Sequence, residues 1–306
     1  MTVPDTKSMV LDLLRGAAPE RADEISALWR RYRPEFEVVP DRAGITMNAN
    51  KHRIQFDLKT LEVLWLIGFC GWKSIETYTP LILTAMLTQG VIDEVLVTDQ
   101  DLGPFEQDYK HRIVIAHSFI DSDNSVFGEW PPDIPRPQSD RASLKDAQDQ
   151  AAFDLTCMAS AYVFLHEFRH VMFAQDGSAP SRRPEEELAC DVWARGILTD
   201  KLAVYAKGHG HDYQRVLNKR AMGMALGSLI LHTITPPHAR WGTGEYPPIA
   251  ERMDALIKGS NLPDNASFWM LAASILVGVM RQSHRPIDIA PQGAKALVAE
   301  LIERMR

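Results

Sequence analysis

The chain has 306 residues, of which 45% are hydrophobic and 24% charged, so it can form one large or two small domains around a sizeable core. Its net charge of −7 and its scattered lysines and arginines argue against a nucleic-acid partner. Residues 1–7 lack the basic start and apolar run of a secretion signal, and the three cysteines form no C-x-x-C pair. Together these features favour a cytoplasmic protein with reduced thiols.

The first part of the chain, residues 1–140, is expected to be an N-terminal α/β region. Residues 5–33 have the apolar spacing of one or two amphipathic helices. Three short strand-like runs separated by turn residues predict a small antiparallel meander, at 36–40, 44–48 and 52–56.

The next segments predict helices at 58–70 and 74–89 and two further strands at 91–97 and 112–116. Either of these strands is a candidate for a sheet edge that binds a peptide as an added strand. Residues 121–140 are rich in proline, aspartate and serine and predict a long surface loop.

Residues 141–306 are expected to form a helical region that packs with the first as one compact unit. The predicted helices span 143–176, 185–206, 212–235, 248–259, 265–283 and 290–305. The apolar stretches 61–72, 221–234 and 268–280 are too short to cross a bilayer and predict buried helices, so no integral membrane span is expected. The predicted fold class is therefore α+β, mainly helical with a small sheet.

The segment His166-Glu167-Phe168-Arg169-His170 spells H-E-x-x-H within the helix predicted over 143–176. Positions i and i+4 of a helix lie one above the other, so both imidazoles can reach one metal ion. Glu167, next to the first histidine, can act as the general base on a water molecule. The helix is apolar on nearly every side, and a metal ion would provide the polar partner that buried imidazoles need.

Glu187 and Asp191 have the same i, i+4 spacing on the following helix. Glu187 can supply a third metal ligand, with Glu186 as the fallback, and Asp191 can accept the outer N–H of a ligating histidine. Three protein ligands leave a fourth position for water, as in catalytic zinc sites, so the predicted cofactor is Zn²⁺. Cys157 and Cys190 are expected to be packing residues.

Tyr246 and His238 are both candidates to stabilise the oxyanion that forms during attack on a carbonyl. They lie in the segment that leads through Pro247 and Pro248 into a rigid helix start. Arg252, on that helix, is expected to form a salt bridge or contact substrate. His232, in an apolar helix, is expected to be a core histidine.

The motif strings at 164–171 and 187–194 resemble the E-x-x-x-D branch of the zincins, the gluzincins. Chain length, the mid-chain motif and the Pro-Pro segment resemble most the Lit-type phage-exclusion peptidases. That resemblance implies a zincin-like zinc endopeptidase that cleaves a protein or peptide substrate in phage exclusion or a stress response, with a possible activating peptide or partner.

A weaker resemblance links the same strings to the ImmA/IrrE-type metallopeptidases, which control repressors. A non-catalytic metal-binding regulator is the alternative from a different class. The presence of Glu167 beside the histidines argues against it, because a purely structural metal site has no use for a base.

Overall fold

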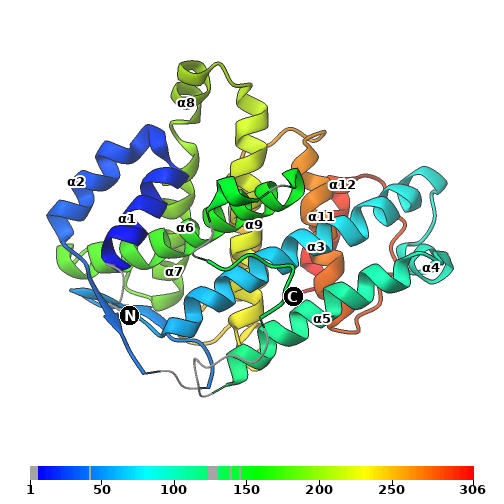
Figure 1. The fold of residues 1–306 in the computed structure, drawn as a ribbon, viewed down its shortest axis with the longest axis horizontal. Coiled ribbons are helices and arrows are strands. Elements are labelled where there is room, and N and C mark those ends of the chain that lie inside the picture. The colour runs from blue at the N-terminus through cyan, green and yellow to red at the C-terminus, as the bar shows by residue number, and fades with distance from the viewer. Residues whose placement is uncertain (1–5, 41–42, 123–129, 138–139, 145) are drawn as a thin grey trace.

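The computed structural model describes residues 6–40, 43–122, 130–137, 140–144 and 146–306. Its described part is mainly helical with one three-stranded sheet, which confirms the predicted α+β class. The long helices cross one another in the middle of the molecule, and the sheet lies at one end of it (Figure 1).

The chain begins with two helices, α1 (Thr6–Ala17) and α2 (Ala22–Tyr32), joined by the short 3-10 helix η1 (Pro19–Arg21). The strands β1 (Glu35–Val38), β2 (Met47–Ala49) and β3 (Arg53–Phe56) follow. Their order in the sheet is β1-β3-β2, with β2 antiparallel and β1 parallel to β3. The predicted all-antiparallel meander is therefore wrong for its first strand.

Aromatic packing explains why β1 pairs with β3. The Phe36 ring lies 5.6 Å from that of Trp29 and 6.1 Å from that of Phe56, and Phe56 contacts Phe164 in the motif helix at 6.4 Å, all centroid to centroid. A long connection separates β1 from β2, whereas a short turn joins β2 to β3. Burial of these rings thus selects the far edge of β3 for β1.

Helix α3 (Leu58–Thr88) is continuous where two helices were predicted. The expected break lies at Gly71, which instead allows close packing on α9 (Tyr213–Ile234). A Cβ atom on Gly71 would lie 2.2 Å from Cδ2 of Leu226. The glycine is therefore a close-approach site between two helices and does not end the helix.

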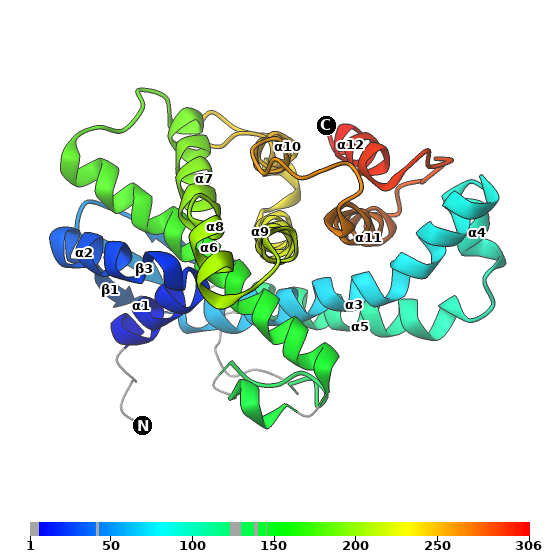
Figure 2. The same ribbon diagram turned by 90° about the horizontal axis from the view of Figure 1, so that it is seen from above.

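The two further strands are wrong predictions, because both segments are helical. Residues 92–98 form α4 (Ile92–Thr98), and 112–116 lie inside α5 (Leu102–Asp121). In α5 the buried residues include Tyr109, Ile113, Ala116 and Ile120, which is helical spacing. α5 runs beside α3, with α4 at their common end (Figure 2), so neither segment offers a strand edge to a peptide.

The region after residue 140 is helical, as predicted, and its first long helix is α6 (Ala147–Asp176). The prediction of one helix over 185–206 is corrected to two, α7 (Arg183–Thr199) and α8 (Leu202–His209). The remaining elements are η2 (Arg141–Ser143), η3 (Pro237–Ala239), α10 (Ile249–Lys258), α11 (Ser267–Gln282) and α12 (Ala294–Glu303). Of the predicted loop, 123–129 and 138–139 lie outside the described residues, and 130–137 contains neither helix nor strand.

The three long apolar stretches lie in α3, α9 and α11 and contribute many buried residues to one core cluster, as expected. Among the described residues, no single helix has the length and apolarity needed to cross a bilayer. α3 and α4 meet these criteria only as a pair, bent by 117°.

Candidate functional site

Helix α6 carries the H-E-x-x-H motif, and its ends are fixed locally. The Asp146 side chain accepts a hydrogen bond from the Gln148 N–H at the start, and Gly177 adopts a left-handed conformation (φ 62°) at the end. His166 and His170 are both buried, one turn apart on the same face. α7 and α10 place the remaining charged groups of the site around them.

Three side chains converge on one point. Nε2 of His166 lies 3.1 Å from Nε2 of His170 and 3.1 Å from Oε2 of Glu187, and Nε2 of His170 lies 3.3 Å from Oε1 of Glu187. Metal–nitrogen bonds of 2.0–2.1 Å in a tetrahedral zinc site give ligand–ligand edges of about 3.3–3.4 Å. These three side chains therefore have the spacing of one face of such a site.

Each imidazole uses its other nitrogen to contact a carboxylate. Nδ1 of His166 lies 2.9 Å from Oδ1 of Asp191, and Nδ1 of His170 lies 2.6 Å from Oε1 of Glu186. A carboxylate at Nδ1 favours the tautomer with its proton there, which leaves the Nε2 lone pair free. Both lone pairs then point to the same place, and a cation between them would remove their repulsion.

Asp191 is 1% exposed and is the centre of a hydrogen-bond network. Arg252 on α10 donates to both of its oxygens, from Nε at 2.7 Å and from Nη2 at 2.8 Å, and the Tyr162 hydroxyl donates at 2.6 Å. Arg252 thus forms the expected salt bridge. A buried carboxylate with this many donors stays ionised and holds the His166 ring in place.

Arg183 covers the other side of the site. Its Nη1 donates to Oε1 of Glu186 at 2.8 Å, and its Nη2 lies 3.2 Å from Oε1 of Glu187. The first turn of α7 begins with Arg183-Pro184, which places the following glutamates at the helix N-terminus, where negative charge is favourable.

The site favours positive charge at its centre. Burial lowers the pKa of His166, but Asp191 and Glu187 outweigh this effect and raise it to about 9. Although burial opposes ionisation of Glu187, hydrogen bonds from both histidines and the charge of Arg252 hold its pKa far below the usual range. When the imidazoles are neutral, the site has two more carboxylates than guanidiniums. The carboxylates are those of Glu167, Glu186, Glu187 and Asp191, and the guanidiniums are those of Arg183 and Arg252.

His166, His170 and Cys190 also form a buried group that could hold a metal ion, because their ligand atoms lie within 4.8 Å of one another. Cys190 was expected only to pack. Its Sγ lies 3.5 Å from Nδ1 of His170, on the ring edge away from Glu187. The two possible ligand sets share both histidines and differ in the third group.

The Glu167 carboxyl group forms no hydrogen bond or salt bridge with the described part of the chain, and the side chain is half-buried. Tyr246 is 46% exposed. Burial and the negative charges of Glu187 and Glu167 raise its pKa, so its hydroxyl lies within electrostatic range of the site. His238 is exposed on η3 and forms no hydrogen bond with any described residue of the site.

The chain matches the family model of peptidase U49 over residues 54–272, which is more than half of its length. The chain belongs to the peptidase U49 family, that of the Lit proteases. The matched range contains every side chain of the site described above. Among curated proteins and solved structures, none matches the chain significantly, and the ImmA/IrrE resemblance is not shown.

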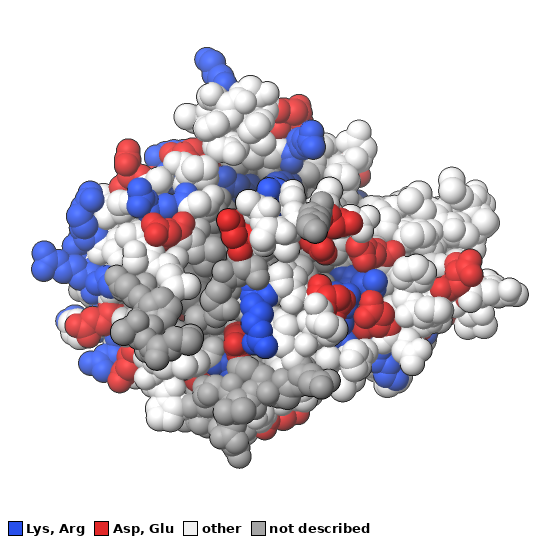
Figure 3. Space-filling model, viewed as in Figure 1, with Lys and Arg blue, Asp and Glu red and all other residues white. Residues whose placement is uncertain are grey.

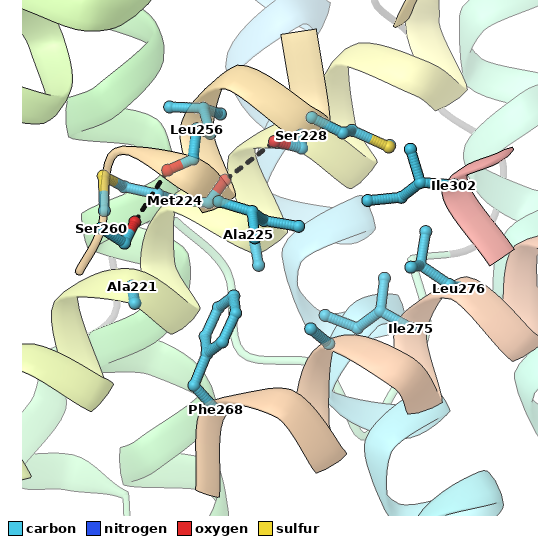
Figure 4. A pocket seen from close by; sticks show the side chains of 13 residues that line it. Ala221, Met224, Ala225, Ser228, Leu256, Ser260, Phe268, Ile275, Leu276 and Ile302 are labelled. Carbon is cyan, nitrogen blue, oxygen red and sulfur yellow. Dashed lines mark hydrogen bonds between the residues drawn. The ribbon is translucent and has the colours of Figure 1, made fainter. Parts of the chain in front are cut away.

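Family membership therefore supports a peptidase that acts on a protein substrate. A pocket with a mainly apolar lining lies elsewhere, between α9, α10, α11 and α12 (Figure 4). Its lining holds no titratable group, and the hydroxyls of Ser228 and Ser260 donate to carbonyls one turn earlier in their own helices. On the face seen in Figure 3, acidic and basic side chains are interspersed.

Three parts of this peptidase site were not found from the sequence. Glu186 was kept only as a substitute ligand, whereas it orients His170, and neither Tyr162 nor Arg183 was considered. Tyr162 lies four residues before His166, and Arg183 three and four residues before the two glutamates. The helical spacing of these residues from His166 and from the two glutamates, three or four positions, was the sequence pattern that could have predicted both contacts.

Proposed function

We propose that this peptidase is a zinc-dependent endopeptidase. The observation that carries the proposal is the convergence of the Nε2 atoms of His166 and His170 with the Glu187 carboxylate. In addition, the Nδ1 atom of each imidazole contacts another carboxylate. The donor set of two imidazoles and one carboxylate is typical of catalytic zinc. We assign His166, His170 and Glu187 as the ligands.

Glu187 is preferred to Cys190 as third ligand for two reasons. It approaches the Nε2 edge of both rings, whereas the cysteine thiol contacts only the Nδ1 edge of His170. Burial also raises the pKa of the Cys190 thiol well above its usual range, which opposes the thiolate that binds a metal.

Zn²⁺ bound by these residues would polarise a substrate carbonyl and lower the pKa of a water molecule. Glu167 has no competing partner among the described residues and accepts the proton of the attacking water. The same carboxyl group then donates that proton to the leaving amine. Arg252 and Tyr162 hold Asp191, which fixes the tautomer and orientation of His166 throughout.

Tyr246 is the better of the two candidates for stabilising the oxyanion. Its pKa responds to the charges of Glu187 and Glu167, and its hydroxyl is a neutral donor. His238 is exposed on η3, and no described residue of the site contacts its imidazole. The comparison of Tyr246→Phe with His238→Ala tests the choice, because only the first should lower kcat.

The Lit protease family supports a biological role in phage exclusion or a related stress response, which we propose takes place in the cytoplasm. An activating peptide or partner would then control access of the protein substrate. The alternatives are a non-catalytic metal-binding regulator and a repressor-controlling protein of the ImmA/IrrE type. New protein N-termini in a bacterial extract, produced by wild type and not by Glu167→Gln, would exclude a purely binding role.

The first experiment is the metal content of purified wild type, His170→Ala and the surface control His52→Ala. About one zinc per chain is expected in wild type and in His52→Ala, and much less in His170→Ala, because one of the three protein ligands is lost. A well-folded wild type that binds no metal even after zinc is added would overturn the proposal.

A further inference from the structure

A second polar pocket lies where the C-terminal ends of α9, α11 and α12 meet the start of α10. Its polar lining comes from His232 at the end of α9, Arg240 after η3, and Ser283 and Arg285 after α11. Apolar side chains complete it, among them Trp241, Ile249 and Met280. The pocket has a volume of about 640 Å³, counting its open mouth.

The two arginines of this pocket have no counter-ion in the described part of the chain. Within the described residues, neither Arg240 nor Arg285 forms a salt bridge with a carboxylate. Arg281, one turn earlier on α11, is in contrast paired through Nε and Nη2 with the two oxygens of Glu106 at 2.8 and 2.9 Å. The two guanidiniums that line the pocket therefore differ from that of their neighbour Arg281 in having no carboxylate partner among the described residues.

Toward the described residues, each of these arginines uses only one of its N–H donors, in a hydrogen bond to a carbonyl at a helix end. Nε of Arg240 donates to the Thr235 carbonyl, and Nη1 of Arg285 donates to the Arg304 carbonyl. A guanidinium has five N–H donors, so four remain on each side chain. Both side chains are half-buried, and Arg285 also lies over the Trp241 ring at 5.0 Å.

His232 is 9% exposed, and its imidazole forms no hydrogen bond with any described residue. Burial and the neighbouring charges of Arg240, Arg285 and His117 lower its pKa to about 3. The charge of Asp121 acts on His117, but the Asp121 carboxylate pairs with neither arginine. The imidazole, expected to be a satisfied core histidine, instead lines the pocket without a hydrogen bond from the described residues.

We propose that this pocket binds a small oxyanion, a phosphate or carboxylate group, between Arg240 and Arg285. Planar guanidinium groups match both kinds of oxyanion with paired N–H donors. The ligand would offset the repulsion between the two cations and give the His232 imidazole an acceptor or donor. The apolar lining around them would receive a non-polar part of the same ligand.

Such an ion would also lie at the base of the segment that carries Tyr246. The backbone N–H of Ile249 donates to the carbonyl of Arg240 at 3.0 Å and closes the segment between them. Within it, the Thr243 N–H donates to the carbonyl of Tyr246 at 2.8 Å. Anion binding at Arg240 would therefore restrain this segment, whether or not zinc binds at His166.

The test is a titration of the full chain with inorganic phosphate and, separately, with succinate, both at constant ionic strength. The His232 imidazole resonance is the reporter. A saturable shift is expected, together with a rise in the His232 pKa, because a bound anion favours the imidazolium. The stronger of the two ligands identifies the phosphate or the carboxylate class.

Arg240→Gln and Arg285→Gln should each weaken binding by about tenfold to hundredfold, as expected for loss of hydrogen bonds to a charged group. Arg141→Gln, which removes a guanidinium paired with Asp154 outside the pocket, is the control and should leave affinity unchanged. A non-saturable response, or equal responses in wild type and the double variant, would overturn the proposal.

Discussion

The molecule has two clusters of ionisable side chains that are constructed in opposite ways. Around His166 and His170, the guanidiniums of Arg183 and Arg252 contact carboxylates, and the carboxylates are in excess. Around His232, two guanidiniums and an imidazole share a pocket without a carboxylate partner among the described residues. The first cluster is suited to a cation and the second to an anion.

The difference shows that the charges left unpaired in each cluster decide whether it suits a positively or a negatively charged ligand. In the site on α6, Arg252 and Arg183 do not reduce the attraction for a cation, because they hold Asp191, Glu186 and Glu187 in position. In the second pocket the arginines bind helix-end carbonyls with one donor each and leave the others free.

The largest expected effect is that of a substitution in the first cluster, around His166 and His170. Glu167→Gln should lower peptidase turnover by about 10²–10⁴-fold, since general acid–base catalysis contributes a factor of that size. The measurement is turnover of a cleaved protein substrate, with zinc content and thermal unfolding as controls. Unchanged turnover in a variant that keeps its metal would contradict the assignment of Glu167 as the base.

Arg252→Gln should lower the free energy of unfolding by about 3–5 kcal/mol, because Asp191 would keep a buried charge without its main partner. Urea denaturation measures the change. Lys295→Gln removes an exposed pair with Asp264 and should cost about 1 kcal/mol or less. Similar costs for the two variants would show that the Arg252–Asp191 pair is not a buried ion pair in solution.

Glu186→Gln should weaken zinc binding by about 10- to 100-fold, the usual effect of removing a carboxylate that orients a ligating histidine. Competition with a chelator of known affinity measures it. Glu185→Gln, one residue earlier on the exposed side of α7, is the matched control. Equal affinities for the two variants would mean that His170 is oriented by other contacts.

The smallest effect is expected in the second cluster. Burial and the charge of Arg285 lower the pKa of Arg240, so the folded state disfavours this charge. Without added anion, Arg240→Gln should therefore change the free energy of unfolding by less than about 1 kcal/mol, in the stabilising direction. Urea denaturation in a buffer free of phosphate checks this, and a large loss would show that Arg240 is needed for the fold itself.

The sequence by itself determined the features that depend on neighbours along one helix. The i, i+4 spacing of His166 with His170 predicts their common face, and that of Glu187 with Asp191 predicts theirs; both pairs adopt it in the structure. The apolar runs of α3, α9 and α11 likewise predicted buried helices. These features can be predicted from the geometry of a helical turn and from which residues are apolar.

Only the tertiary structure decided which distant elements meet. The short β-branched runs at 91–97 and 112–116 became helices that bury Ile92 and Leu96 in α4, and Ile113 and Ala116 in α5, against the rest of the molecule. Arg252 reaches Asp191 from 61 residues away, and Arg240 and Arg285 come together from separate helix ends. Charge pairing across such distances depends on helix packing, which no local pattern encodes.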